Sequence, residues 1–195
     1  MSEEKTYPVS EAAASQSHLS VSQYNEMYQK SIDDAETFWT EQASKFLTVF
    51  ETWDQVSSSD FTTATATWFH GAKLNASYNC IDRHLEKRGD QTAIIWEGDE
   101  PDQDLNISYL DLHEAVCRLS NALKARGVEK GDRVCIYMPM IPEAAYAMLA
   151  CARIGAVHSV VFGGFSPESI KDRILDSDCR TVITADEGVR GGKII

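Results

Sequence analysis

The sequence has no long apolar run and little basic charge, and both absences narrow the classes of protein to which it can belong. No stretch of its 195 residues approaches the roughly 20 apolar residues that span a bilayer. Lys and Arg number 18 against 30 Asp and Glu, so the formal net charge is −12. We therefore do not expect a membrane protein. We also do not expect nonspecific binding to nucleic acid or anionic lipid, because the negative net charge would oppose it. A small local basic site for an anionic ligand stays open.

Metal-binding and nucleophilic patterns are absent from the sequence as well. The five cysteines lie far apart, at Cys80, Cys117, Cys135, Cys151 and Cys179. No Cys or His pair has the short spacing of a zinc site, and the histidines fit no metalloprotease or Ser-His-Asp pattern. We therefore expect no metal site and no complete catalytic constellation. Widely spaced free thiols, and a first segment without a basic-then-apolar signal, favour a cytoplasmic protein.

What the sequence does contain is an ordinary globular mixture, with 43% hydrophobic and 25% charged residues, which argues against disorder and coiled coil. Residues 1–21 are rich in Ser, Ala and Glu without an apolar period, so we expect a mobile tail. Residues 22–78 are expected to form a helical amino-terminal segment in which Asp34 caps a second helix. The Ser-rich run 57–60 is predicted to be a loop, and 65–69 a short extended segment.

The chain from 79 to 195 is predicted to form a separate domain. Asn79 is expected to start a helix that ends before Gly89. Two extended segments, 92–96 and 105–109, flank a strongly acidic stretch and are expected to make a hairpin with an acidic tip.

From residue 105 onward, strands and helices alternate regularly. The expected strands cover 105–109, 133–138, 157–162 and 180–185, and the helices between them begin at Ser108, Pro142 and Ser166, the last with Leu175 facing inward. The strands are short apolar runs with little alternation, which is typical of a parallel sheet covered on both faces. We therefore predict an α/β fold, a parallel sheet flanked by helices, preceded by the α-helical amino-terminal segment.

The first candidate ligand site is the turn Phe162-Gly163-Gly164, which follows a predicted strand and precedes a helix. Glycines let the backbone approach a ligand closely, and the first N–H groups of a helix attract anions. The alternative is a tight turn whose glycines only supply positive φ angles. The turn is not a nucleotide-binding Walker loop, because no Lys-Ser or Lys-Thr pair follows it.

The second candidate is the loop from Asp186 to Lys193, which follows the last predicted strand. Ligands of open parallel sheets gather at the carboxyl ends of the strands. Arg190 and Lys193 are two cations separated only by Gly191 and Gly192, so a phosphate group would fit between a guanidinium and an ammonium, near free glycine N–H groups. The alternative is a solvated loop in which Arg190 pairs with a neighbouring carboxylate.

Five stretches of the chain resemble the amino-terminal part of the acetyl-coenzyme A synthetase family, in the acetate- and propionate-activating branch of the adenylate-forming enzymes. They are CIDRHL at 80–85, AIIWEG at 93–98, YMPMIPEA at 137–144, ACARIGAVHSVVFGGFSPE at 150–168 and ITADEGVRGGK at 183–193. The likeness runs from about Ser22 to the end of the chain. It implies that 79–195 is the start of an AMP-binding α/β domain.

The resemblance also implies an activity and a set of ligands. The family joins acetate to ATP, which gives acetyl-AMP and pyrophosphate, and then transfers the acetyl group to coenzyme A. The resemblance implies that the cofactor-binding residues are Arg190, Gly191, Gly192 and Lys193, at the 3′-phosphate end of coenzyme A, and Phe162, Gly163 and Gly164, against its nucleotide. Many relatives carry Arg where Lys193 stands, and lysine keeps the charge but not the bidentate fork.

The family's motifs for ATP and Mg²⁺, and its catalytic lysine, would come after Ile195. The expected partners of the longer enzyme are therefore the small molecules acetate, ATP and coenzyme A, and we expect this chain to be inactive alone. Two alternatives remain open: a standalone coenzyme A-binding module, and a noncatalytic subunit that docks onto a partner. An incomplete sheet leaves apolar surface uncovered, so self-association or marginal stability is also expected.

Overall fold

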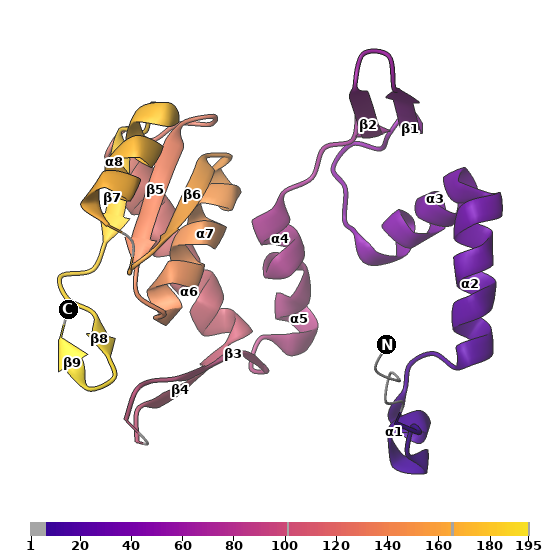
Figure 1. Cartoon of the computed structure of the whole chain (residues 1–195), viewed down its shortest axis with the longest axis horizontal. Helices are drawn as coiled ribbons and strands as arrows, with labels where there is room; N and C mark the ends of the chain where they lie inside the picture. The colour runs from indigo at the N-terminus through magenta and orange to yellow at the C-terminus, as the bar shows by residue number, and fades with distance from the viewer. Residues whose placement is uncertain (1–6, 101, 165, 195) are drawn as a thin grey trace, which may run out of the picture. The chain divides into compact units, whose positions relative to one another are not determined.

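The computed structural model describes residues 7–194 except 101 and 165, and it describes only the backbone of Phe162 and Arg190. The described chain divides into two compact units (Figure 1). The first comprises the described residues up to Leu47 together with Thr52–Ala72, and the second comprises Thr48–Glu51 and the chain from Lys73 onward. The domain boundary expected at 78/79 stays a prediction.

Three helices begin the first unit: α1 (Glu11–Gln16), α2 (Val21–Asp33) and α3 (Ala35–Phe46). The cap predicted at Asp34 is confirmed, because its side chain accepts a hydrogen bond from the backbone N–H of Thr37 at 3.2 Å. The expected tail contains one regular element, α1, in which the Ser10 hydroxyl accepts from the backbone N–H of Ala13. Residues 1–6 of that tail lie outside the described residues.

The loop predicted at 57–60 is wrong, because these residues belong to strand β1 (Gln55–Asp60), which pairs antiparallel with β2 (Thr65–His70). The chain reverses at Asp60, whose carboxylate accepts hydrogen bonds from the backbone N–H and the hydroxyl of Thr62 at 2.8 and 2.6 Å. These bonds lower the pKa of the Asp60 carboxyl. Pairing with β2 therefore overrides the weak strand preference of serine.

The second unit starts with short helical pieces rather than with one helix. They are α4 (Ala76–Cys80), the 3₁₀ turn η1 (Asp82–His84) and α5 (Leu85–Arg88). The start predicted at Asn79 is wrong: Asn75 caps α4, because its side-chain oxygen accepts from the N–H of Tyr78 at 3.1 Å. Asn79 instead holds the backbone of Thr48 through two 2.8 Å bonds.

The predicted hairpin is confirmed as β3 (Thr92–Glu97) paired antiparallel with β4 (Asp104–Ser108). The expectation that 105–109 belongs to the parallel sheet is wrong, since β4 pairs with β3 alone in a separate two-stranded sheet. Its last residue, Ser108, starts α6 (Tyr109–Ala125) through the predicted capping box, in which the Ser108 hydroxyl donates to Asp111 at 2.6 Å.

A three-stranded parallel sheet in the order β6-β5-β7 forms the centre of the second unit (Figure 1). Its strands are β5 (Arg133–Met138), β6 (Val157–Phe162) and β7 (Thr181–Thr184). The connecting helices are α7 (Pro142–Ile154) and α8 (Pro167–Asp176). The predicted α/β fold with a parallel sheet flanked by helices is thus confirmed. The core joins β5 to α6 and α7 through Val116, Val134, Ile136, Ala147 and Cys151, all buried.

The sheet is not fully covered on both faces, and it leaves apolar surface exposed, as expected for an incomplete sheet. Val160 on β6 and Val182 on β7 are 49% and 46% exposed. The expected inward orientation of Leu175 on α8 is wrong, because this side chain is 67% exposed.

Candidate functional site

The two candidate loops of the sequence meet at one cavity of about 490 Å³ in the second unit. It lies at the carboxyl ends of β5, β6 and β7, where open parallel sheets bind ligands. Gly163 and Gly164 line one part, and the loop that leads from β7 toward Arg190 lines another. The full lining is Asp99, Tyr137, Met138, Pro139, Met140, Gly163, Gly164, Thr184, Ala185, Asp186, Glu187, Gly188 and Val189.

Two hydrogen bonds fix the walls of this cavity. The hydroxyl of Tyr137, near the end of β5, donates to the carbonyl of Gly163 at 3.0 Å and ties the turn after β6 to the central strand. The indole N–H of Trp96, on β3, donates to the carbonyl of Met140 at 2.8 Å. The hairpin β3–β4 is thereby attached to the loop that follows β5.

Glycine at 163 is not required by a positive φ angle. The alternative explanation of this turn, that its glycines only supply positive φ angles, therefore does not apply to Gly163. Its φ lies outside the left-handed region, and an added Cβ would stand 3.5 Å from the carbonyl oxygen of Met138, an ordinary contact. Neither backbone strain nor crowding therefore requires glycine here. The side chain of Phe162 lies outside the described part of the chain.

The second loop ends in a hairpin of two very short strands, β8 (Val189–Arg190) and β9 (Lys193–Ile194). Gly191 and Gly192 form its two-residue turn, with φ angles of 58° and 71°, as a type I′ turn requires. These glycines are therefore needed for the turn itself. Figure 1 shows the hairpin following β7 at the carboxyl end of the sheet.

The hairpin places the two candidate cations at paired positions, since Arg190 and Lys193 are backbone partners in the β8–β9 register. Lys193 is exposed, and the side chain of Arg190 is not among those described. The backbone N–H of Gly192, expected to be free for a phosphate, donates to the carboxylate of Asp99 at 3.4 Å. Arg190 and Lys193 as ligand-binding residues therefore stay a prediction.

The charged side chains that line the cavity are all acidic: Asp99, Asp186 and Glu187. Carboxylates repel phosphate, so the cavity wall itself does not suit an anion. The positive charge comes from the adjoining hairpin. An anionic ligand at this end of the sheet would meet positive charge outside this lining, at the adjoining hairpin that carries Arg190 and Lys193.

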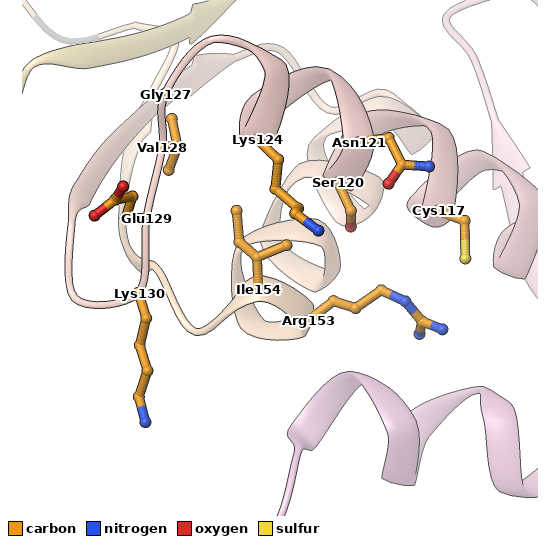
Figure 2. Close-up of a pocket in the computed structure, with 10 residues that line it drawn as sticks. All are labelled: Cys117, Ser120, Asn121, Lys124, Gly127, Val128, Glu129, Lys130, Arg153 and Ile154. Atoms are coloured by element: carbon orange, nitrogen blue, oxygen red, sulfur yellow. The ribbon is translucent and has the colours of Figure 1, made fainter.

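A second cavity (Figure 2), which the sequence did not predict, is lined by residues that precede β5 and that end α7, and so lies near the amino-terminal end of the parallel strands. Its volume is about 580 Å³. It is bounded by one face of α6, the loop before β5 and the end of α7. The lining residues are Cys117, Ser120, Asn121, Lys124, Gly127, Val128, Glu129, Lys130, Arg153 and Ile154.

An ion pair beside this second cavity joins Arg153 at the end of α7 to Asp82 in η1. The two guanidinium nitrogens of Arg153 donate to the two carboxylate oxygens at 2.6 and 2.7 Å. Burial by itself raises the pKa of Asp82, but the hydrogen bond and charge of Arg153 outweigh it, and the pKa lies below the ordinary 3.8. The hydrogen bond to Asp82 likewise raises the pKa of Arg153.

Two further side chains complete this cluster. The Nε2 atom of His113 lies 3.5 Å from Asp82 Oδ1, 3.4 Å from Arg153 Nη2 and 3.5 Å from the sulfur of Cys117. His113 and Cys117 are one turn apart on α6, a spacing visible in the sequence. Nothing in the sequence indicates that Asp82, 71 residues before Arg153, joins them.

Comparison with known proteins gives the chain a family. Residues 81–193 match the family model described as AMP-binding enzyme. The chain belongs to the AMP-binding enzyme family. A second model, described as acetyl-coenzyme A synthetase N-terminus, matches residues 24–80. The two matches are contiguous and together cover most of the chain.

Curated relatives agree with this family. The acetyl-coenzyme A synthetase of Alkalilimnicola ehrlichii is 64% identical over 99% of the chain, and that of Halorhodospira halophila is 65% identical over 100%. Acetyl-coenzyme A synthetase 2 of Pseudomonas aeruginosa is 63% identical over 100% of the chain. The chain spans about 30% of the length of each. The resemblance to the amino-terminal part of acetyl-coenzyme A synthetase is therefore confirmed.

Within residues 7–100, 102–164 and 166–194, no helix has the length and apolar character that a bilayer crossing needs. In those same ranges, no cluster of three or more His, Cys, Asp or Glu side chains has the geometry to hold a metal ion.

Proposed function

We propose that this chain is the amino-terminal part of an acetate–coenzyme A ligase and forms one wall of the site for the nucleotide tail of coenzyme A. The observation that carries the proposal is the shared cavity: the Gly163-Gly164 turn and the loop leading to Arg190 line the same hollow at the carboxyl ends of the sheet. The relatives that match the whole chain carry the name acetyl-coenzyme A synthetase.

The residues present fit the tail of coenzyme A in two respects. The cavity offers a partly apolar wall with Tyr137, Met138 and Pro139 for a neutral group. The adjoining hairpin brings Arg190 and Lys193 to paired positions, where their charges would meet the 3′-phosphate. When bound, coenzyme A supplies the thiol that accepts the acetyl group.

ATP, Mg²⁺ and acetate would bind through residues beyond this chain. Activating a phosphate needs a positive clamp and a metal around the reacting group, and the described acids at the cavity carry the opposite charge. We therefore expect the longer enzyme to catalyse acetate-dependent exchange of pyrophosphate into ATP, and the 195-residue chain to show none. Exchange by this chain alone would contradict the proposed division.

Binding of coenzyme A tests the proposed contacts directly. In the full-length ligase, Arg190→Ala is expected to weaken coenzyme A binding by about tenfold or more, as for a lost charge-assisted contact. Lys193→Arg is expected to keep or strengthen binding. The matched control is Arg180→Ala, which removes an exposed arginine at the opposite end of β7. Isothermal titration calorimetry measures all three, and equal losses in Arg190→Ala and Arg180→Ala would contradict the assignment.

A second function, a standalone coenzyme A-binding module, is favoured by the fact that both candidate loops are present in this chain. It predicts measurable affinity of the isolated 195 residues for coenzyme A, abolished by Arg190→Ala. The ligase proposal predicts weak or no binding, because the remaining wall of the site is elsewhere. The same calorimetric titration on the isolated chain separates the two.

A further inference from the structure

We propose that Cys117 is a modification site, at which the chain forms a mixed disulfide with small anionic disulfides such as oxidised glutathione. The inference rests on the cluster of Cys117, His113, Arg153 and Asp82, of which Cys117 and Arg153 line the second cavity (Figure 2). It is independent of the proposed coenzyme A site, which lies at the other end of the parallel strands.

Cys117 is distinguished from the other four cysteines by its surroundings. Cys135 and Cys151 are buried, and burial raises the pKa of both thiols, that of Cys151 to about 11. The Cys179 thiol donates to the carbonyls of Arg133 and Thr181 at 3.2 and 3.0 Å. Cys80 is exposed on α4 but lines neither cavity. Among the described cysteines, Cys117 alone lines a cavity with a histidine in contact.

The cluster can accept the proton of the Cys117 thiol. Arg153 Nη2, which can only donate, lies 3.4 Å from His113 Nε2 and suits the neutral ring with its lone pair on this nitrogen, whereas Asp82 Oδ1 at 3.5 Å suits a proton there. The thiol lies 3.5 Å from the same nitrogen. Once protonated there, the imidazolium faces the Asp82 carboxylate at 3.5 Å. The thiolate left behind is the nucleophilic form of cysteine.

The cavity wall favours a reagent with negative charge. Lys124, Lys130 and Arg153 line it against a single acid, Glu129, although Asp82 offsets the charge of Arg153. Lys124 lies on the same helix as Cys117, two turns further on (Figure 2). The chain as a whole carries −12, so this local excess of cations is contrary to its overall charge.

The exchange step is balanced without any other reactant. The Cys117 thiolate attacks one sulfur of the disulfide, the new sulfur–sulfur bond forms as the old one breaks, and the second half leaves as a thiolate. That thiolate takes up the proton held on His113 Nε2. One disulfide is consumed and one is formed, and the oxidant is the small disulfide itself.

The test compares oxidised glutathione with cystamine, a cationic disulfide, on the 195-residue chain at pH 7.5, with each cysteine followed by peptide mass spectrometry. With oxidised glutathione, we expect Cys117 to react at least about fivefold faster than Cys80. We also expect the ratio of the rate with oxidised glutathione to the rate with cystamine to be larger at Cys117 than at Cys80. Reaction of Cys80 first, or identical charge preferences at the two cysteines, overturns the proposal.

Two variants assign the effect to the cluster. His113→Gln is expected to slow modification of Cys117 severalfold while the rate at Cys80 stays the same. Lys124→Gln is expected to reduce only the preference for the anionic reagent. Reaction of the buried Cys135 and Cys151 would report unfolding. If these cysteines react in His113→Gln, that variant is disregarded and Lys124→Gln alone tests the proposal. The Lys124 side chain is exposed, so its replacement leaves the core undisturbed. An unchanged charge preference in Lys124→Gln contradicts the proposal.

Discussion

Replacing Arg153 with methionine is expected to destabilise the second unit by about 2–3 kcal/mol at pH 7. The substitution removes a bidentate pair and leaves the Asp82 carboxylate, whose side chain is only 17% exposed, without its cation. Breaking a fully buried pair costs about 3–5 kcal/mol, and an exposed pair contributes about 0.2–1 kcal/mol. The exposures of 24% for Arg153 and 17% for Asp82 place this pair between the two limits.

Urea unfolding followed by circular dichroism measures the change. With a slope near 2 kcal/mol per molar urea, Arg153→Met is expected to lower the midpoint by about 1–1.5 M. Lys73→Met is the matched control, because Lys73 pairs with Glu51 at a similar distance but with both side chains mostly exposed. Similar shifts in the two variants would refute the argument that burial makes the Arg153 pair strong.

The pair also gives stability a defined dependence on pH. The pKa of Asp82 in the folded chain lies below its ordinary 3.8, so its contribution is present above that value and is lost as pH falls through the lower folded pKa. Asp82→Asn is therefore expected to be less stable than the parent at pH 7, with the difference shrinking only below about pH 4. A difference that disappears between pH 5 and 7 would assign the effect to another group.

Three further substitutions test separate parts of the fold, each by urea unfolding unless stated. Gly155 and Gly127 have similar φ angles of 77° and 86°, but a Cβ added at Gly155 would lie 2.9 Å from Lys130, whereas one added at Gly127 would meet open space. Gly155→Ala is therefore expected to lower the free energy of unfolding more than Gly127→Ala. Equal losses would mean that the backbone conformation alone sets the cost. Ser108→Ala removes the capping box of α6 and is expected to cost about 1 kcal/mol; a change below about 0.3 kcal/mol would contradict this. Replacing exposed Val160 by Thr is expected to reduce self-association of the chain in light scattering, and a monodisperse parent would contradict it.

The elements that could be predicted from the sequence are those whose limits depend on neighbouring residues. Helix α6 begins at the Ser108 capping box, and α7 begins at Pro142 and ends at Gly155 in the left-handed region. Each signal acts within one helical turn. The capping of α3 by Asp34 is of the same kind.

The elements that were missed depend on partners far away in the chain. Residues 57–60 form a strand only because β2 pairs with them. Asparagine at either 75 or 79 could cap the start of a helix. Contacts with distant backbone favour Asn75, because its side-chain amide also donates to the carbonyls of Ala152 and Arg153. Such tertiary contacts override local preference.

The same distinction explains what could be anticipated at the candidate sites. Parallel strands bring their carboxyl ends together, so the topology alone predicted that the turn at Gly163 and the loop after β7 would meet. The second cavity depends on side chains from α6, α7 and the loop before β5. The cluster around His113 also needs Asp82, which was expected inside a helix that starts at Asn79 but lies in the separate turn η1. Residue order along the chain carried no signal for that arrangement.

The acidic lining of the first cavity leads to one more prediction about the proposed coenzyme A wall. Asp99 accepts the N–H of Gly192 at 3.4 Å and lines the cavity beside two other acids. Asp99→Asn keeps a side-chain oxygen for that N–H and removes one negative charge next to the hairpin. Because the carboxylate would repel the 3′-phosphate that we propose Lys193 contacts, coenzyme A binding to the proposed full-length ligase is expected to tighten by about two- to fivefold.

The control for this substitution is Asp102→Asn, which removes the same charge from the exposed tip of the β3–β4 hairpin without touching the cavity lining. Calorimetry at low and at high salt distinguishes a local charge effect, which salt weakens, from a change in the shape of the hairpin. If Asp99→Asn weakens binding at both salt concentrations, the Asp99 carboxylate does not act by repelling the phosphate of coenzyme A. The charge effect expected here would then be refuted, and the acceptance of the Gly192 N–H by Asp99 would be the contact that matters.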